Sequence, residues 1–220
     1  MKSALSLLML GVLVAAGCSS VPHGQKRIRA QVDPQDRPMA ILPFQPTGGE
    51  TRTEHGLWLA MMATNLLQDE YPNLRIVGPR ELNESLSPAD MSAALRGEID
   101  PVAVGRAMGV DLVVSGWVVH YSLHRDDLQR TWVGQIGFRF DVYDVSGGQA
   151  DRIARTRDER FTIPEELGER FDPKYETMGE DTFQAALFRH GARKVAEFFY
   201  DHVVPANKAE RPTAIVGTRD

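Results

Sequence analysis

Cys18 is the residue of this sequence whose side chain is best suited to covalent chemistry. It is the only cysteine among 220 residues, so it can form neither a disulfide nor a cysteine-based metal site within one chain. A thiol is a strong nucleophile once it is deprotonated. Directly before it stand the small residues Ala15, Ala16 and Gly17, which would let a peptidase approach the backbone. The chemistry to expect is therefore that of a single thiol beside an accessible peptide bond.

Residues 1–17 have the composition of a secretory signal peptide. One positive charge, on Lys2, precedes an apolar run of about a dozen residues that ends at Ala16. A membrane-spanning helix needs roughly 20 apolar residues, so the run is too short to span a bilayer, whereas its length and its small final residues are typical of a signal peptide. An ordinary secretory signal with an incidental cysteine and an uncleaved anchor helix are the alternatives.

The stretch Val14-Ala15-Ala16-Gly17-Cys18 resembles the lipobox of bacterial lipoproteins. The resemblance implies that the Cys18 thiol receives a diacylglyceryl group and that cleavage before Cys18 frees an amine for a third acyl chain. Stable anchoring needs more than one chain, which such a cysteine provides. In Gram-negative lipoproteins an aspartate after the cysteine favours retention in the inner membrane. Ser19 at this position implies the inner leaflet of the outer membrane, facing the periplasm.

His120 and His124 form a second group that could do chemistry, because Asp126 and Asp127 follow them and all four are residue types that bind zinc. The segment leaves a predicted strand, however, where a spacing of four does not bring side chains together as it does on a helix. We therefore predict exposed loop residues and no metal. The sequence also has no Gly-x-Ser-x-Gly, Walker or dinucleotide-binding motif. We expect no cofactor and no enzymatic activity.

Composition and charge limit the remaining classes. Hydrophobic residues make up 42% and charged residues 25% of the chain, as in globular proteins. The formal net charge of −5 becomes −6 when Lys2 is removed with the signal peptide. This balance argues against binding to nucleic acid, which requires clustered Lys and Arg. It also argues against electrostatic docking on anionic lipid, so we expect the acyl chains to hold the protein at the membrane.

The first half of the domain alternates predicted strands and helices. The apolar run 38–44 and the segment 74–77 are predicted strands, and 110–121 is the strongest strand signal because of its β-branched and aromatic residues. Between them we predict a helix over 53–69, a helical turn over 80–84, a weak helix before Gly97 and a helix that Asp100 caps and Gly109 ends. The predicted inward face of the first helix is Leu57, Ala60, Met61, Thr64 and Leu67. This order implies a partly parallel sheet covered by helices.

The second half predicts an antiparallel hairpin and a final helix. Residues 132–142 alternate between apolar and polar side chains, Ser146-Gly147-Gly148 suits a turn, and 151–163 is charged on both faces like an edge strand. The segment 164–180 is a predicted loop. The predicted helix 181–202 has one apolar side formed by Phe183, Leu187, Gly191, Val195 and Phe198.

These elements define the predicted domain organisation. We expect a lipidated cysteine and flexible tether over 18–37, a single globular α/β (α+β) domain over 38–204 and a disordered tail over 205–220. The expected fold is a mixed sheet, partly parallel with a C-terminal antiparallel hairpin, covered by helices.

The segment 100–118 and the strand 39–44 resemble an α/β domain found in several bacterial envelope proteins. These proteins include the TolB amino-terminal domain, the penicillin-binding-protein activator LpoB and the curli-secretion lipoprotein CsgG. The resemblance implies a lipid-tethered module that binds proteins and catalyses nothing. An oligomeric CsgG-like secretion device is the alternative, although the charged 151–163 arm does not suit a lipid-facing hairpin.

We therefore expect a periplasm-facing, non-catalytic module for the assembly or regulation of a protein complex. Its expected partners are membrane lipid, through acylated Cys18, and an unidentified envelope protein; self-association into a homo-oligomer is left open. The candidate partner-binding residues are Trp58, Tyr121 and the 164–180 loop, because aromatic side chains are frequent at interfaces.

Overall fold

The computed structural model describes residues 25–126, 131–163, 177–205 and 214–216. The predicted signal peptide and Cys18 lie outside these residues. The helices and strands, in chain order, are β1 Gln25–Ile28, β2 Met39–Ile41, β3 Gln45–Pro46, α1 Thr53–Glu70, β4 Ile76–Val77, α2 Pro79–Ser85, α3 Pro88–Arg96, α4 Pro101–Met108, β5 Leu112–Asp126, β6 Thr131–Asp144, β7 Asp151–Thr156, β8 Glu159–Ile163, α5 Glu180–Glu197, β9 His202–Pro205 and β10 Ala214–Val216.

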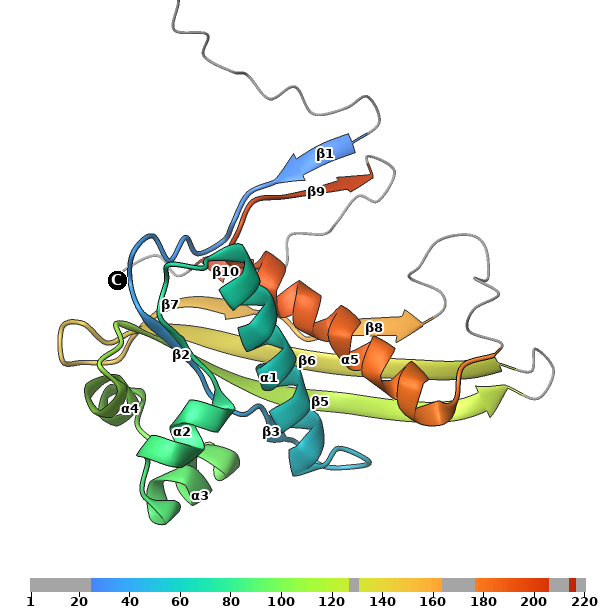
Figure 1. Ribbon diagram of the computed structural model, residues 1–220, viewed down its shortest axis with the longest axis horizontal. Helices are drawn as coiled ribbons and strands as arrows, with labels where there is room; N and C mark the ends of the chain where they lie inside the picture. The colour runs from blue at the N-terminus through green and yellow to red at the C-terminus, as the bar shows by residue number, and fades with distance from the viewer. Residues whose placement is uncertain (1–24, 127–130, 164–176, 206–213, 217–220) are drawn as a thin grey trace, which may run out of the picture.

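The main sheet is mixed, which confirms the predicted fold class. Its strands lie in the order β10-β7-β6-β5-β2-β4, with β3 paired to β5 and β8 paired to β6 (Figure 1). The pairs β2–β4, β2–β5 and β3–β5 are parallel. Parallel strands need a crossover connection, and helices between these strands provide it. The pairs that β6 makes with β5, β7 and β8 are antiparallel.

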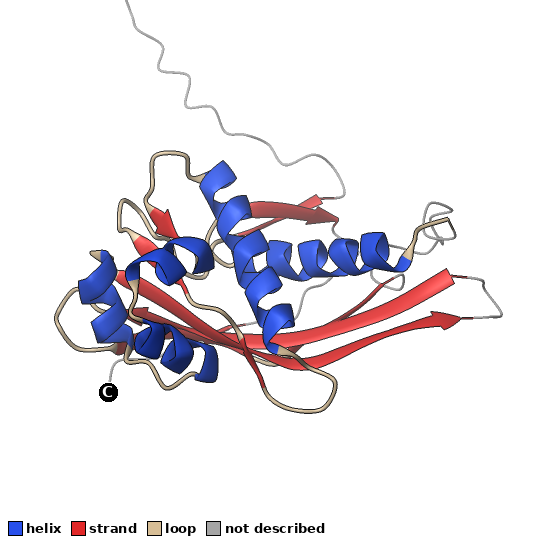
Figure 2. Cartoon of the chain, turned by 60° about the horizontal axis from the view of Figure 1, so that its bottom comes forward, coloured by secondary structure: helices blue, strands red, loops and turns tan. Residues whose placement is uncertain are grey.

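Two hydrophobic cores lie on opposite faces of this sheet. Helices α1 and α5 cross over one face (Figure 2), where Leu112 and Val114 of β5 are buried with residues of both helices. Val113, which points the other way, is buried with α2 and α4. The near-continuous apolar sequence of β5 follows from this double coverage.

Three helices begin with proline at their first residue. Pro79, Pro88 and Pro101 follow Gly78, Ser87 and Asp100. The missing N–H of proline costs nothing at this position, since the first amides of a helix have no partner within it. The Asp100 carboxylate accepts a hydrogen bond from the Val102 N–H at 3.0 Å, and Gly109 ends α4 with a φ of 62°. Both predicted signals of α4 are confirmed.

The inward face of α1 differs from the predicted one. Ala60, Thr64 and Leu67 are buried as expected, but Met61 is 40% exposed. Leu59 and Ala63 are buried instead, because α5 packs across α1 as well as the sheet and rotates the covered stripe.

The hairpin is longer than the sequence predicts, and its returning arm differs from the prediction. Strand β5 continues to Asp126, paired along its length with β6. The return consists of β7 and β8, which both pair with β6. The prediction that this arm is charged on both faces is wrong, because Ala154, Phe161 and Ile163 are buried in the core beneath α1 and α5. The apolar residues of this arm stand between arginines, so its buried face is not apparent from the sequence.

Helix α5 buries the predicted side, including Phe183, Leu187 and Val195, but ends at Glu197. The chain then forms β9, which pairs antiparallel with β1 to make a two-stranded ribbon (Figure 1). Strand β1 falls within the segment assigned to the tether, and Val32 of that segment is 7% exposed. Strand β10, in the predicted tail, pairs with β7. Strands β1 and β10 thus lie within the segments 18–37 and 205–220 of the predicted organisation.

Candidate functional site

Trp58 and Tyr121, the two aromatic residues predicted to bind a partner, meet at one place in the fold. Both rings contact Phe188 of α5: Trp58 edge-on, with ring centroids 5.5 Å apart, and Tyr121 stacked, with centroids 5.7 Å apart. The ring of His55 lies 3.9 Å from that of Tyr121 and 5.6 Å from that of Phe188. We call these four residues the aromatic cluster. It joins α1, β5 and α5.

A glycine allows α1 to approach the sheet closely enough to build this cluster. The N–H of Phe44 donates a hydrogen bond of 3.2 Å to the carbonyl oxygen of Gly56, two residues before Trp58. A Cβ atom on Gly56 would lie 1.6 Å from the Phe44 oxygen. Only glycine therefore permits this backbone contact, which fixes the start of α1 and with it His55 and Trp58.

His55 is a buried titratable residue that the sequence pattern did not reveal. It is 3% exposed, and its Nδ1 accepts a hydrogen bond from the backbone N–H of Arg52 at 3.2 Å. Burial lowers the pKa of His55; the carboxylate of Glu54 opposes this shift and the charge of Arg52 adds to it. The neutral imidazole is thus favoured, with Nδ1 used in capping the helix. This ring supports the fold and is not a free catalytic base.

Tyr121 is held in place by both of its ends. Its hydroxyl oxygen accepts a hydrogen bond from Gln184 Nε2 at 2.6 Å, while its ring packs against His55 and Phe188. Burial raises the pKa of Tyr121, and the Gln184 hydrogen bond opposes that shift. Tyr121 is therefore a fixed part of the fold rather than a free side chain.

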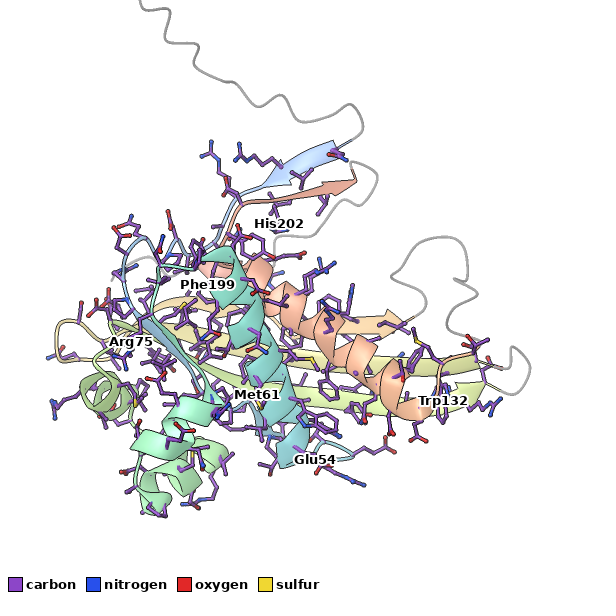
Figure 3. All side chains as sticks on the ribbon, viewed as in Figure 1. Glu54, Met61, Arg75, Trp132, Phe199 and His202 are labelled. Atoms are coloured by element: carbon purple, nitrogen blue, oxygen red, sulfur yellow. The ribbon has the colours of Figure 1, made fainter. Side chains whose placement is uncertain are left out.

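The exposed part of the site is a stripe along α1. Trp58 is 39% and Met61 is 40% exposed, and they lie three residues apart, on one side of the helix. Beside Met61 is a groove of about 640 Å³ between α1 and α2; Figure 3 labels Met61. Its lining residues are Met61, Thr64, Asn65, Gln68, Gly78, Pro79, Arg80, Glu81 and Glu84. We call Trp58, Met61 and this groove the α1 surface.

The histidines considered as metal ligands are not brought together. His120 Nε2 lies 3.1 Å from Gln135 Oε1 on the neighbouring strand, and His124 is exposed near the end of β5. Asp127 lies outside the described residues. Within the described ranges, no three His, Cys, Asp or Glu side chains are grouped so that they could hold a metal ion.

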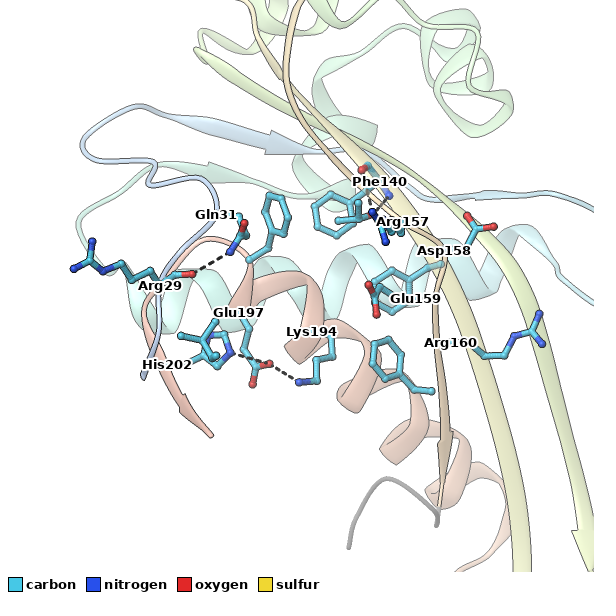
Figure 4. Close-up of a pocket in the computed structure, with 15 residues that line it drawn as sticks. Arg29, Gln31, Phe140, Arg157, Asp158, Glu159, Arg160, Lys194, Glu197 and His202 are labelled. Carbon is cyan, nitrogen blue, oxygen red and sulfur yellow. Dashed lines mark hydrogen bonds and ion pairs between the residues drawn. The ribbon is translucent and has the colours of Figure 1, made fainter. Parts of the chain in front are cut away.

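A second cavity, of about 470 Å³, lies where the end of α5 meets the ribbon and β8 (Figure 4). Phe140, Phe161 and Phe198 line it together with charged residues. Lys194 Nζ lies 3.0 Å and His202 Nε2 lies 3.8 Å from Glu197 Oε2. This group therefore places the start of β9 beside the end of α5.

Among the described residues, none of the helices combines the length and the apolar character that crossing a membrane requires. The predicted lipidation site, Cys18, and most of the candidate 164–180 loop lie outside the described residues.

No protein-family model and no curated protein matches this sequence. Solved structures do show similarity. A PelC dodecamer from Paraburkholderia phytofirmans matches with a TM-score of 0.40 and 15% identity over 76% of this chain and 92% of that chain. The hypothetical protein CT253 from Chlamydia trachomatis matches with a TM-score of 0.42 and 12% identity over 74% and 97% of the two chains. Lipoprotein GNA1162 from Neisseria meningitidis matches with a TM-score of 0.36 and 12% identity over 73% and 99%.

Similarity at these identities and TM-scores says nothing about function. One of the similar structures is described as a lipoprotein. The lipobox of this chain and its resemblance to TolB, LpoB and CsgG stay predictions from the sequence.

Proposed function

We propose that this chain is a lipid-anchored, non-catalytic module of the bacterial envelope that binds a partner protein through the α1 surface. Cys18, in its lipobox-like setting, would carry the acyl chains. Ser19 favours the inner leaflet of the outer membrane, with the domain in the periplasm.

The observation that carries the binding role is the exposure of Trp58 and Met61 side by side on one helix. Large apolar side chains that stay exposed beside a groove are typical of interaction sites. In the described part of the chain, Val203 is the one other large hydrophobic residue that is exposed, and it lies on the ribbon. Trp58 and Met61 therefore form a pair of exposed apolar side chains on α1.

Trp58 also has the properties of an interface anchor. Its edge-on contact with Phe188 holds the ring, so little conformational freedom remains to be lost when a partner binds. Tryptophan is among the residues whose truncation most weakens protein complexes. The partner that fits is a protein with an apolar side chain for the groove and polar groups for Asn65, Gln68 and Arg80 at its sides.

Site-specific photocrosslinking in cells tests this proposal. A photoreactive amino acid at Met61 should give one discrete adduct, and Trp58→Ala should abolish it. The matched control places the same photoreactive group at Gln149, an exposed position in the turn between β6 and β7, where no such adduct should form. Equal adducts at both positions, or an adduct at Met61 that survives Trp58→Ala, would contradict the α1 surface. An adduct of twice the chain mass would identify the partner as a second copy.

A further inference from the structure

The ribbon of β1 and β9 carries a concentration of positive charge. On β1, Lys26 is exposed and the side chain of Arg27 is 54% exposed; Arg29, the residue directly after β1, is exposed as well. The nearest acidic residue of the ribbon, Asp201, lies 3.3 Å from Arg27, and its Oδ1 accepts the N–H of Ala30. The chain as a whole has a net charge of −5. The segment 26–29 thus carries three basic residues and no acidic one in a chain whose net charge is negative.

The ribbon also carries an exposed apolar residue at the same level as these bases. Val203 of β9 is 50% exposed and pairs in register with Arg27 of β1. The two strands pair with each other and not with the main sheet, so the ribbon stands away from the two cores (Figure 1). The contact between Glu197 and His202 holds its base against α5. Arg27 lies opposite Val203 and shares its face, whereas Lys26 lies opposite the buried Val204 and projects from the other face. A long basic side chain beside an exposed valine suits the headgroup region of a bilayer.

The sequence fixes how far the ribbon lies from the proposed anchor. Gln25, the first residue of β1, follows Cys18 by seven residues. A fully extended chain covers about 3.4 Å per residue, so the ribbon begins within about 24 Å of the lipidated sulfur. The ribbon is thus the part of the described structure nearest to the anchor along the sequence, and it can reach the bilayer surface.

We propose that the ribbon docks on anionic phospholipid headgroups and so orients the domain on the membrane. This proposal rests on the lipid anchor of the proposed function, because three basic residues hold a protein weakly unless a tether keeps them near the surface. Each basic residue near an anionic bilayer raises the docking equilibrium by roughly fivefold. Removing Lys26 and Arg29 should therefore lower it by roughly 25-fold.

The test uses the full lipidated chain carrying Val203→Cys. The thiol of Cys18 is blocked by its acyl group, so the introduced thiol takes a fluorophore alone. The labelled protein is reconstituted on vesicles of phosphatidylcholine, with or without phosphatidylglycerol, that contain a spin-labelled lipid. Quenching of the fluorophore reports docking of the ribbon, and flotation of the vesicles reports the anchor separately. Salt should weaken the docking, since it screens exposed charges.

We expect flotation on both kinds of vesicle and strong quenching only with phosphatidylglycerol. Lys26→Ser with Arg29→Ser should remove most of this quenching. The control, Arg96→Ser with Arg106→Ser, removes the same charge from exposed positions on α3 and α4 and should leave the quenching unchanged. Flotation with equal quenching on both vesicles, or equal loss in both double variants, would overturn the ribbon proposal alone. Failure to float on either vesicle would contradict the anchor, and the ribbon proposal with it.

Discussion

Replacing Gly56 by alanine should destabilise the protein, although the same change stabilises most helices. Alanine in a helix interior is favoured over glycine by about 1 kcal/mol. Here the new Cβ would lie 1.6 Å from the Phe44 oxygen. To reach even 3.0 Å, below which Cβ contacts are essentially never found, the start of α1 and the chain at Phe44 must separate by at least about 1.4 Å. That movement breaks the hydrogen bond of 3.2 Å between the Phe44 N–H and the Gly56 oxygen.

Leaving the Phe44 N–H without a partner costs about 1–3 kcal/mol, and the forced repacking costs about 1–3 kcal/mol more. After the helix-propensity gain, we expect Gly56→Ala to lower the free energy of unfolding by about 3 kcal/mol. Thermal unfolding followed by circular dichroism should show a Tm lowered by about 6–12 °C for a domain of this size. Gly147→Ala is the control, because no atom lies within 4 Å of the added Cβ. If Gly56→Ala raised the Tm, the direct backbone contact between α1 and Phe44 would be refuted.

Three further predictions concern buried polar groups. The pKa of His55 is lowered in the fold, so stability should fall as the pH drops below about 6.5. His55→Gln keeps a capping acceptor and should reduce the difference between the free energies of unfolding at pH 7.5 and pH 5.5, measured by urea titration. An unchanged difference would contradict this prediction. The pKa of Tyr71 is raised to about 12, so stability should fall between about pH 10 and pH 12, and Tyr71→Phe should remove the last tyrosinate absorbance to appear in the folded protein. Asp141→Asn should cost about 2 kcal/mol, because Arg155 donates two hydrogen bonds, of 2.7 and 2.8 Å, to a carboxylate that is 2% exposed; Arg80→Ala, at a pair exposed to solvent, should change stability by less than about 0.5 kcal/mol in the same denaturant assay.

The elements whose burial is periodic could be predicted from the sequence. Strand β5 and the apolar side of α5 follow directly from β-branched runs and from a three-and-four spacing, because one dominant core surface covers each of them. Helix α4 could also be predicted, since Asp100 and Gly109 act through local hydrogen bonds and backbone conformation. Such signals do not depend on the rest of the fold.

The ribbon could not be predicted, because its strands are short and lie about 175 residues apart in the sequence. Neither strand alternates clearly, and the two form their ladder of hydrogen bonds with each other. The aromatic cluster was missed in part for a similar reason. Trp58 and Tyr121 were candidates from their residue types, whereas His55 and Phe188 join them only when α5 crosses α1. A histidine three residues into a helix is a weak hint of a capping role and gives no hint of burial.

The central claim is that acyl chains on Cys18 hold this domain at a membrane, and mass spectrometry of the mature amino-terminal peptide tests it most directly. The peptide should begin at Cys18 and carry a diacylglyceryl group and a third acyl chain. The Cys18→Ser variant should lose these chains and leave the membrane fraction. A mature protein that begins with an unmodified Cys18, or that retains Lys2, would contradict the account.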